Sequence, residues 1–463
     1  MTDSRPNALS PLDGRYADKC ADLAALFSEA ALIAKRVRVE AAWFRQLAAS
    51  GRFAALPSPS ADVETCLHAL WHGVDGAGVS RVKAIERETN HDVKAVEYFV
   101  RERLAAAGAA PAALEFVHFA CTSEDINNLA YALMLAEARE RMLLPAIAAV
   151  RSHLLGFADR HAALAMLSRT HGQAASPTTL GKEAANFAAR IARAASALAS
   201  VEILGKFNGA VGCFNAHVAA DPVHDWRAES RRLVTGLGLA ANELTTQIEP
   251  HDWIAAYCDA LARANTILVD LCRDAWGYVS LGYFAQKAVA GEVGSSTMPH
   301  KVNPIAFENA EGNAGLANAM LRHFSEKLPV SRWQRDLTDS TVMRNLGAAL
   351  GHSLLAWRSA LAGLERVEPD AARISGDLDA HWEVLGEAIQ MVMRAEAVAG
   401  VPGMEDPYER LKDLTRGHRV DAARMQEFVS GLGLSADAEQ RLLALTPGSY
   451  HGIAPQLVDH LKK

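Results

Sequence analysis

The stretch Gly291–Pro304 carries residue types that together could bind a carboxylate. Paired serines, Ser295 and Ser296, follow a glycine there, and Lys301 and Asn303 lie between two prolines. Glycine and proline are unfavourable inside helices, so this stretch is expected to form a loop with free backbone amides. Such amides and the compact positive charge of Lys301 can stabilise an anion. The alternative is a plain glycine- and serine-rich linker, but a spacer would need neither the lysine nor the asparagine.

His171, in the segment Arg169–Gln173, is a candidate proton donor. A histidine titrates near neutral pH, which suits the transfer of a proton to a leaving group. Gly172 follows it and leaves room for a close approach, and helical spacing begins near Thr179. Taken alone, any one of the 17 histidines is better explained as a hydrogen-bonded loop residue.

Four basic side chains, Arg15, Lys301, Arg335 and Arg344, provide donors for a substrate with several negative charges. Arginine is suited to paired hydrogen bonds with a phosphate or a carboxylate. The net charge of −7 does not exclude such a local basic pocket. Asn309 follows the stretch Gly291–Pro304 by one helical turn, where it either faces a site or caps a helix.

Thr122 and Ser123 come directly before a helical pattern and are followed by acidic residues. This order is typical of a helix N-cap. The same geometry directs free N–H groups and hydroxyls at a bound carboxylate, so both interpretations can hold together. His91 and Asp92 have a similar alternative as a helix-end capping pair, and Gln247 by itself is an ordinary loop glutamine.

The elements that position these residues are expected to be helices. Half of the residues are hydrophobic while only 6% are aromatic, and Ala and Leu dominate the apolar set. Ala and Leu favour helices, whereas sheets favour β-branched and aromatic residues. The fold class is therefore predicted to be all-α.

Apolar residues recur at helical spacing over 252–286, 307–328 and 346–364. A further pattern over 125–157 is expected to be separated or kinked at Pro145. Long helices joined by short polar links predict a bundle.

With 463 residues the chain exceeds what one hydrophobic core usually serves. We expect three domains. They are an N-terminal helical domain over 1–112, a central long-helix bundle over 113–365 that carries the candidate loop, and a C-terminal helical domain over 366–463.

The composition argues against several classes of protein. A net charge of −7 is unfavourable for a broad nucleic-acid or anionic-membrane surface. The six cysteines are scattered, which favours reduced thiols over a metal site or a disulfide framework. The start of the chain lacks a signal-peptide core, and no apolar run approaches the ~18 residues that span a bilayer. We therefore expect a cytoplasmic protein without metal, organic cofactor, nucleic-acid partner or membrane contact.

The stretch Gly291–Pro304 resembles the signature loop of the fumarase/aspartase superfamily, Gly-Ser-Ser-x-Met-Pro-x-Lys-x-Asn-Pro, and matches every fixed position. Members of that superfamily eliminate fumarate or run a related cycloisomerisation. The resemblance implies three mostly helical domains and a homotetramer in which four central bundles pack together. It also implies active sites shared between subunits.

Three other segments, Ser10–Tyr16, Thr89–Lys94 and Gln334–Ser340, resemble the adenylosuccinate lyase family, in the bacterial branch that begins Ser-Pro-x-Asp-Gly-Arg-Tyr. The resemblance implies cleavage of adenylosuccinate to AMP and fumarate. It also implies cleavage of succinylaminoimidazole carboxamide ribotide to AICAR. The alternatives are a 3-carboxymuconate cycloisomerase, an argininosuccinate lyase, or a catalytically silent bundle.

By resemblance, His171 is the proton donor and Ser295 is the base. From the residues alone serine is a poor base, and a histidine, most obviously His91, would be preferred. The resemblance further implies a set of contacts to a small nucleotide substrate. These are Arg15, Tyr16, Asn90, His91, Asp92, Thr122, Ser123, Gln247, Ser296, Lys301, Val302, Asn303, Asn309, Arg335, Ser340, Thr341 and Arg344.

Overall fold

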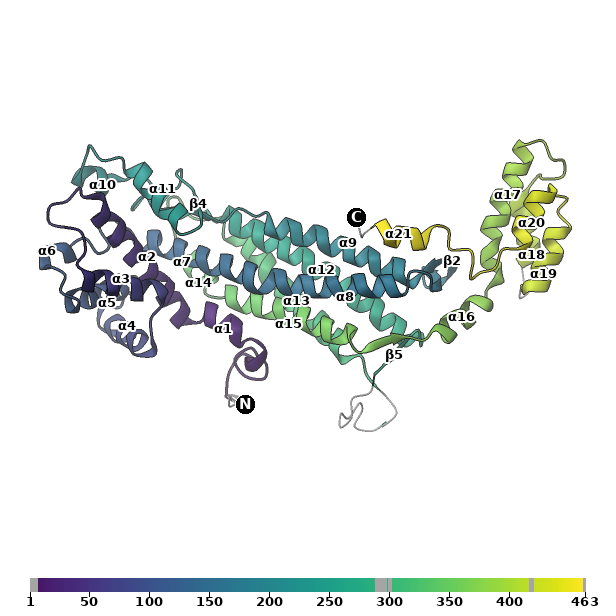
Figure 1. The fold of residues 1–463 in the computed structure, drawn as a ribbon, viewed down its shortest axis with the longest axis horizontal. Helices are drawn as coiled ribbons and strands as arrows, with labels where there is room; N and C mark the ends of the chain where they lie inside the picture. Colours follow the sequence, from purple (N-terminus) through teal and green to yellow (C-terminus); the bar gives the residue numbers. More distant parts are fainter. Residues whose placement is uncertain (1–6, 288–297, 299–301, 416–419, 461–463) are drawn as a thin grey trace. The chain divides into compact units, whose positions relative to one another are not determined.

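The computed structural model describes residues 7–287, 298, 302–415 and 420–460, and most of them are helical (Figure 1). The predicted all-α class is confirmed. In the described part of the chain the strands are short and form three two-stranded sheets. The sheets pair β1 (Ala165–Thr170) antiparallel with β2 (Gln173–Thr179), β3 (Leu204–Gly205) parallel with β4 (Ala240–Ala241), and β5 (Phe284–Gln286) antiparallel with β6 (Val367–Pro369).

The described helices range in length from 3 residues in η1 to 29 residues in α12. Those up to residue 236 are η1 (Ala17–Lys19), α1 (Ala21–Phe27), α2 (Glu29–Ser50), α3 (Ala61–His72), α4 (Gly76–Thr89), α5 (Asp92–Ala106), α6 (Pro111–Leu114), α7 (Ser123–Ala138), η2 (Arg139–Leu143), α8 (Leu144–Arg160), α9 (Leu180–Ala199), α10 (Asn215–Ala220) and α11 (Trp226–Gly236). The later ones are α12 (Asp252–Ser280), α13 (Ile305–Lys327), α14 (Thr338–Met343), α15 (Leu346–Leu364), α16 (Ala371–Asp379), η3 (Trp382–Leu385), α17 (Gly386–Val398), α18 (Pro407–Thr415), α19 (Ala422–Ser430), α20 (Ala436–Leu443) and α21 (Ala454–His460).

The chain divides into two compact units, and several long helices contribute to both. Unit 1 consists of Met1–Ile147, Ala194–Thr266 and Ala310–Arg358, and unit 2 of Ala148–Arg193, Ile267–Asn309 and Ser359–Lys463. The three domains expected from the sequence stay a prediction, because this division does not test their boundaries.

In unit 1 the N-terminal helices pack against α7. Helix α2 contacts α3, α5 and α7, and α1 also contacts α7. The N-cap of α2 is Ser28, whose hydroxyl accepts from the amide of Ala31 at 3.2 Å, and its C-cap is Gly51 with φ 64°. Helix α7 is buried on all sides over 124–135, which is the pattern of a helix at the centre of a core.

A seam of polar side chains joins α12, α13 and α15 within unit 1. The amide of Asn265 donates to Asn318 Oδ1 at 3.1 Å and to Ser353 Oγ at 2.8 Å. Asn265 Oδ1 accepts from the Trp357 indole at 2.9 Å. All four side chains are buried, where an unpaired polar group is costly. The seam therefore favours one register of these three helices.

Helices α7, η2 and α8 form one continuous run, Ser123–Arg160 (Figure 1). The expected separation into two helices at Pro145 is therefore wrong, and the helix is instead irregular just before the proline. A proline lacks an N–H, and its ring clashes with the carbonyl four residues earlier in a regular α-helix. Here η2 is a π-helical turn in which the Leu144 amide donates to the Arg139 carbonyl, so the ladder widens just before the proline.

The same run is long and apolar enough to cross a membrane, judged by length and composition only. The sequence analysis missed it because charged residues interrupt its apolar pattern. Core helices of soluble proteins pass the same test. In this run, 39% of the residues in the most apolar stretch are buried within the chain.

The ends of the later helices follow the sequence with one correction. Helix α15 has the predicted bounds, and α13 begins and ends within two residues of them. Helix α12 ends at Ser280, before the predicted end at residue 286. The reason is Gly282, which has a left-handed conformation with φ 73° and lets the chain turn into β5.

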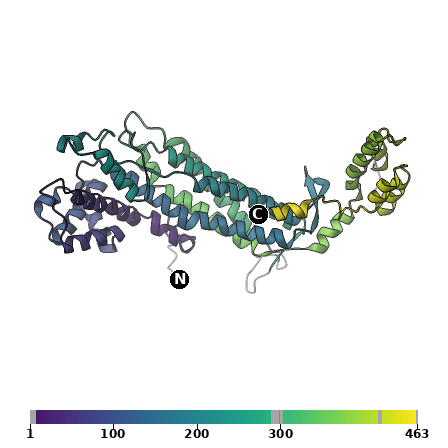
Figure 2. The same ribbon diagram turned by 45° about the horizontal axis from the view of Figure 1, so that its top comes forward.

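In unit 2, α8, α9 and α12 surround a small apolar cavity lined by Phe157, Phe187 and Leu271, among others. The C-terminal helices α17 to α20 have a core of their own that includes Ile389 and Met425. Figure 2 shows these yellow-green helices grouped together.

Candidate active site

His171 lies at the tip of the hairpin formed by β1 and β2, and its side chain is exposed. Thr170 pairs with Gln173, so His171 and Gly172 are the two central residues of a tight turn. Both have a left-handed backbone, with φ 54° and 76°. Such turns favour Asn, Asp or Gly. A histidine held in this conformation indicates a role for its side chain, because strained residues gather at functional sites.

The hairpin that carries His171 is anchored to α16. Arg169 of β1 forms an ion pair with Asp377 Oδ2 at 2.5 Å, and the hydroxyl of Tyr283 donates to the same oxygen. Burial raises the pKa of Asp377, but the hydrogen bonds from Tyr283 and Arg169 lower it by more. The net result is a pKa below the usual value. Asp377 is therefore charged at neutral pH and holds the base of the hairpin.

Thr122 and Ser123 lie at the start of α7, as the sequence predicts. Thr122 is the N-cap, and its amide donates to Asp125 Oδ2 at 2.8 Å. Asp125 Oδ1 accepts from the Asn208 amide at 3.0 Å and lies 2.9 Å from the ammonium of Lys206. Both charged side chains are fully buried. This buried ion pair fixes the turn that carries Thr122 and Ser123.

The structure brings Gln247 and Arg335 together. Arg335 Nη1 donates to Gln247 Oε1 at 3.2 Å, and Gln247 Nε2 donates to the carbonyl of Ala210 at 2.9 Å. Arg335 Nη2 lies 3.3 Å from Glu124 Oε2. The side chain of Arg335 is 16% exposed. Its guanidinium is therefore a partly exposed cation. Its orientation is set by one neutral partner, Gln247, and one acidic partner, Glu124.

Asn90, His91 and Asp92 form the junction between α4 and α5. Asn90 is the left-handed C-cap of α4, and His91 Nδ1 accepts from the amide three residues further on, so the capping interpretation of His91 is confirmed. Asp92 accepts from Arg36 at 2.8 Å and from Arg344 at 3.2 Å. Burial raises the pKa of Asp92, but Arg36 and Arg344 contribute to a net lowering. Asp92 and Arg344, two expected contacts, therefore lie side by side.

Four other expected contacts belong to unit 1. Tyr16 is the N-cap of η1, and Arg15 beside it is exposed. Ser340 and Thr341 lie in α14, and the amide of Ser340 donates to Asp339 Oδ1 at 2.7 Å.

Val302, Asn303 and Asn309 belong to unit 2, as does His171. The carbonyl of Val302 accepts from the Gln286 side chain at 2.7 Å. Asn309 lies inside α13 and its Oδ1 accepts from the Ser359 hydroxyl of α15 at 2.8 Å, so it is not a helix cap. The expected residues Ser295, Ser296 and Lys301 lie outside the described residues.

A buried cluster next to Arg335 was missed from the sequence. Polar atoms of Glu124, His251 and Asp339 all lie within 4.8 Å of one another, and the three side chains are buried. Carboxylates and imidazole can ligate divalent cations. Arg335 already places a positive charge beside Glu124, so this donor set fits an ion-pair network and we assign no metal to it. The acidic residue after Ser123 was the one available signal, and it was interpreted as part of the N-cap.

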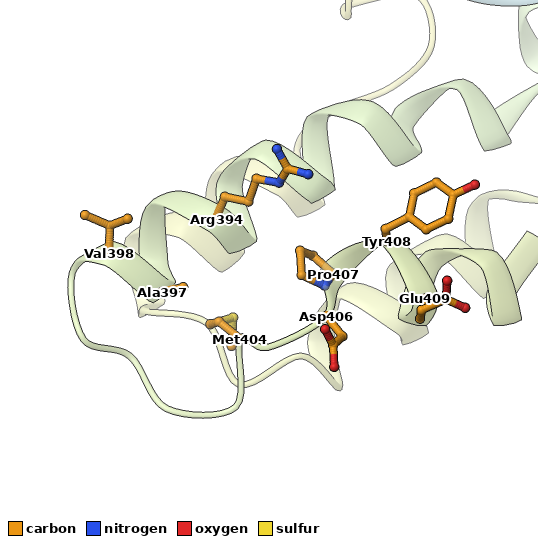
Figure 3. A pocket seen from close by; sticks show the side chains of 8 residues that line it. All are labelled: Arg394, Ala397, Val398, Met404, Asp406, Pro407, Tyr408 and Glu409. Carbon is orange, nitrogen blue, oxygen red and sulfur yellow. The ribbon is translucent and has the colours of Figure 1, made fainter.

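A groove of about 610 Å³ in unit 2 does not contain the expected residues (Figure 3). Figure 3 shows Arg394 on α17 and Tyr408 near the start of α18 among its lining side chains. Arg394 shares the lining with two acidic residues, Asp406 and Glu409, so the groove has no single charge that would select an anionic substrate. We do not assign the active site to it.

Comparison with known proteins places this chain in a family. The model of a family described as "Lyase" matches residues 14–320, and one described as "Adenylosuccinate lyase C-terminal" matches residues 331–451. An adenylosuccinate lyase of Escherichia coli is 52% identical over 455 residues, which cover 98% of both chains. The chain belongs to the adenylosuccinate lyase family. The resemblance seen in the sequence is confirmed.

Other adenylosuccinate lyases are similarly close. That of Vibrio cholerae is 52% identical over 98% of both chains, and that of Legionella pneumophila is 49% identical over 99% of both chains. Two solved structures share the fold at lower identity. A 3-carboxy-cis,cis-muconate lactonizing enzyme from Pseudomonas putida has a TM-score of 0.75 at 22% identity, covering 95% of this chain and 96% of that one. A fumarate lyase from Mesorhizobium has a TM-score of 0.76 at 20% identity, covering 95% and 97%. These two confirm the fumarase/aspartase-like fold.

Proposed function

We propose that the protein cleaves adenylosuccinate to AMP and fumarate, and succinylaminoimidazole carboxamide ribotide to AICAR and fumarate. The observation that carries this proposal is the identity of about half of all residues, over nearly the full length, with relatives named adenylosuccinate lyase. The products place the enzyme in purine nucleotide biosynthesis. We propose that it works in the cytoplasm.

The proposed reaction is a β-elimination in which Ser295 and His171 move the protons. Ser295 removes the proton from Cβ, and the electrons of that bond form the double bond of fumarate. The C–N bond breaks, its electron pair goes to the nitrogen, and His171 protonates that nitrogen. Acid and base must both be positioned for this step. The exposed place of His171 at a hairpin tip supports its role, because the imidazole is free to reach a substrate.

Negative charge builds up on the carboxylate next to the carbanion, so the site must stabilise it. We propose that Lys301 and the amides of the loop around Ser295 do so. The N-terminus of α7 with Thr122 and Ser123 offers a second place for a carboxylate, because helix N-termini favour anions. Arg335 and Arg344 are proposed to bind the remaining anionic groups, and the hydrogen bond that Arg335 donates to Gln247 supports a shared site.

We further propose that the enzyme is a homotetramer whose active sites combine residues of different subunits. Two features support this assembly. In the most apolar stretch of Ser123–Arg160, most residues are not buried within one chain, and neighbouring chains would cover them. Trp333 and Leu337, on either side of Arg335, are 92% and 71% exposed. Large apolar side chains at such positions are typical of interfaces.

A fumarate-release assay tests the activity. The purified protein is mixed in turn with adenylosuccinate, argininosuccinate and 3-carboxymuconate, and Ser295→Ala protein is the control for contaminating activity. Turnover of adenylosuccinate far above that of the other two is expected. Release from argininosuccinate, conversion of 3-carboxymuconate, or no turnover at all would each contradict the proposal.

A further inference from the structure

Three helix N-termini meet at the buried cluster next to Arg335. Glu124 lies in the first turn of α7, His251 directly precedes α12, and Asp339 lies in the first turn of α14. Their side chains are 1–6% exposed. His251 Nε2 lies 3.5 Å from Asp339 Oδ2. Glu124 follows Ser123 and contacts Arg335, and Asp339 precedes Ser340 and accepts from its amide, so two of the three residues adjoin residues proposed to bind the substrate.

Arg335 is the member of this group that connects it to the proposed site. Its guanidinium donates to Gln247 and lies 3.3 Å from Glu124 Oε2. The other carboxylate oxygen of Glu124 is buried and, within the described part of the chain, has no hydrogen-bond partner. Both ring nitrogens of His251 are in the same situation. The cluster therefore has acceptors that are ready to take a proton without breaking an existing bond.

The charges of the cluster do not balance without that proton. Glu124, Asp339 and Glu249, which lies 3.8 Å from His251, bring three negative charges as carboxylates, while Arg335 and even a protonated His251 bring only two positive ones. A buried group with an unpaired charge is unfavourable, so one additional proton makes the cluster neutral. When Arg335 turns its charge to a substrate anion, Glu124 loses a partner, and the need for the proton increases.

We propose that Glu124 is a positioning residue that directs Arg335 and takes up a proton when Arg335 binds the anionic group of the substrate. This inference rests on the proposed function, because it assumes that Arg335 meets the phosphate of the substrate, which AMP also carries. His251 and Asp339 share in the proton balance. Glu124 does not touch the reacting atoms.

Burial and the charged groups that face Glu124 together set its pKa near neutral pH. Burial raises the pKa of Glu124 to about 7, the charges of His251, Arg335 and Lys206 act against this, and Asp339 adds to it. The pKa of Asp339 remains below its usual value, because the imidazole of His251, 3.5 Å away, and the charge of Arg335 outweigh burial. Glu124 is therefore the carboxyl group that gains or loses the proton near neutral pH.

Calorimetric titration with AMP tests the proposal on the full-length enzyme. Titration at about pH 7.5, where the AMP phosphate is already mostly a dianion, in two buffers of different ionisation enthalpy measures the protons taken up on binding. The parent enzyme is expected to take up a fraction of a proton. Glu124→Gln keeps an acceptor for Arg335 but cannot titrate, so it should bind AMP and lose this uptake.

The affinity for AMP should follow the same rule across pH. Uptake of a proton on binding means that affinity falls as pH rises, so the parent should weaken between about pH 7 and 9 by up to about tenfold for a pKa change of one unit. Glu124→Gln should stay nearly flat over this range. Asp339→Asn removes a charge that raises the pKa of Glu124, so its transition should move to lower pH.

Glu229→Gln is the matched control. Glu229 is also buried and is also held by an arginine and a glutamine, Arg232 at 2.7 Å and Gln46 at 2.6 Å, but among the residues that the structure describes it has no hydrogen bond to the proposed site. It should keep the proton uptake of the parent.

The following results separate the possibilities. Uptake in Glu124→Gln equal to the parent's, or no uptake in the parent, overturns the positioning role while fumarate release by the parent still supports the function. An equal loss of uptake in Glu229→Gln and Glu124→Gln also overturns it. If the parent neither binds AMP nor releases fumarate, the proposed function fails and this inference fails with it. If Glu124→Gln does not fold, the uptake by the parent and the shift in Asp339→Asn decide.

Discussion

The ammonium of Lys206 lies 2.9 Å from Asp125 Oδ1, and neither side chain is exposed. The other oxygen of Asp125 holds the amide of Thr122. One buried pair of charges thus supports the turn that we propose to receive a substrate carboxylate.

Removing one partner of this pair should destabilise the protein more than removing both. Asp125→Asn leaves Lys206 buried without its counter-charge, which is expected to lower the free energy of unfolding by about 3–5 kcal/mol. Adding Lys206→Met should recover part of that loss. Denaturant unfolding at one fixed protein concentration measures the effect.

The control for this prediction is Glu137→Gln. Glu137 pairs with Lys35 at 2.6 Å, but both side chains are partly exposed, so a loss of about 0–1 kcal/mol is expected. An equal loss in the free energy of unfolding for Asp125→Asn and Glu137→Gln would show that burial does not increase the contribution of the Asp125–Lys206 pair to stability.

Fumarate release should survive the removal of metals. The proposed steps use protein groups alone, and the described cluster of possible ligands already has Arg335 as its cation. The assay is repeated after exhaustive dialysis against a chelator. Activity that disappears and returns when a divalent metal is added would contradict the prediction.

The proposed acid and base should be separable by substitution. His171→Asn and Ser295→Ala are each expected to lower kcat by about 10²–10⁴-fold with little change in KM, because their contribution is made in the transition state. Asparagine is chosen because it tolerates the left-handed backbone of residue 171. Lys301→Ala should weaken binding as well, since its charge meets a carboxylate before and during the reaction.

Exchange of a Cβ deuterium into water distinguishes the two roles. If proton removal is reversible in the parent, His171→Asn should still exchange the label while failing to release fumarate. Ser295→Ala should do neither. Normal exchange in Ser295→Ala would identify another residue as the base, and His91 would be the first candidate.

Shared active sites predict recovery of activity from inactive proteins. If His171 and Ser295 of one site come from different subunits, mixing Ser295→Ala with His171→Asn and allowing subunits to exchange should rebuild some complete sites. Partial activity is expected, and it should depend on the mixing ratio. Mass spectrometry of the intact assemblies confirms that mixed tetramers have formed. Mixed tetramers without activity would argue against shared sites.

Acid should weaken the anchor of the His171 hairpin. The pKa of Asp377 is lowered in the folded state, so its stabilising effect is complete above its unfolded pKa of about 3.9 and disappears as pH falls through the folded value. Asp377→Asn should therefore destabilise the protein at neutral pH, and the difference from the parent should shrink below about pH 4. Thermal unfolding across pH measures this. A difference that stays constant with pH would show that the charge of Asp377 does not matter.

The fold was predictable where its signal is local. Helix α15 follows directly from the spacing of its apolar residues, since each turn repeats the same requirement. The hairpin around His171 was not predicted, because Ala165–Thr170 lacks the alternation of apolar and polar residues that marks a strand. The π turn before Pro145 was missed because the rule for proline predicts a break and not the relaxed ladder that avoids it.

In the candidate site, too, the residues whose role depends on near neighbours in the sequence were predictable, and those whose partners are distant in the sequence were not. Thr122 and His91 were recognised as caps because a cap depends on residues within one turn. Lys206 gave no signal, since its partner Asp125 lies 81 residues away in the sequence and only the fold brings them together. His251 was missed for the same reason. The base was inferred from the family alone, because serine is a poor base and its chemistry does not indicate that role.

The π turn at Arg139–Leu143 connects the number of residues in this helical run with the presence of Pro145. A π turn contains one residue more than the α turn that would replace it, so the run Ser123–Arg160 carries an insertion. Deleting one residue there restores the regular ladder and brings the ring of Pro145 against a carbonyl. Replacing Pro145 by alanine removes the reason for the insertion. A deletion in this turn is therefore compatible with the helix only when the proline changes with it, so that an ancestor or a descendant of this chain would gain or lose both together.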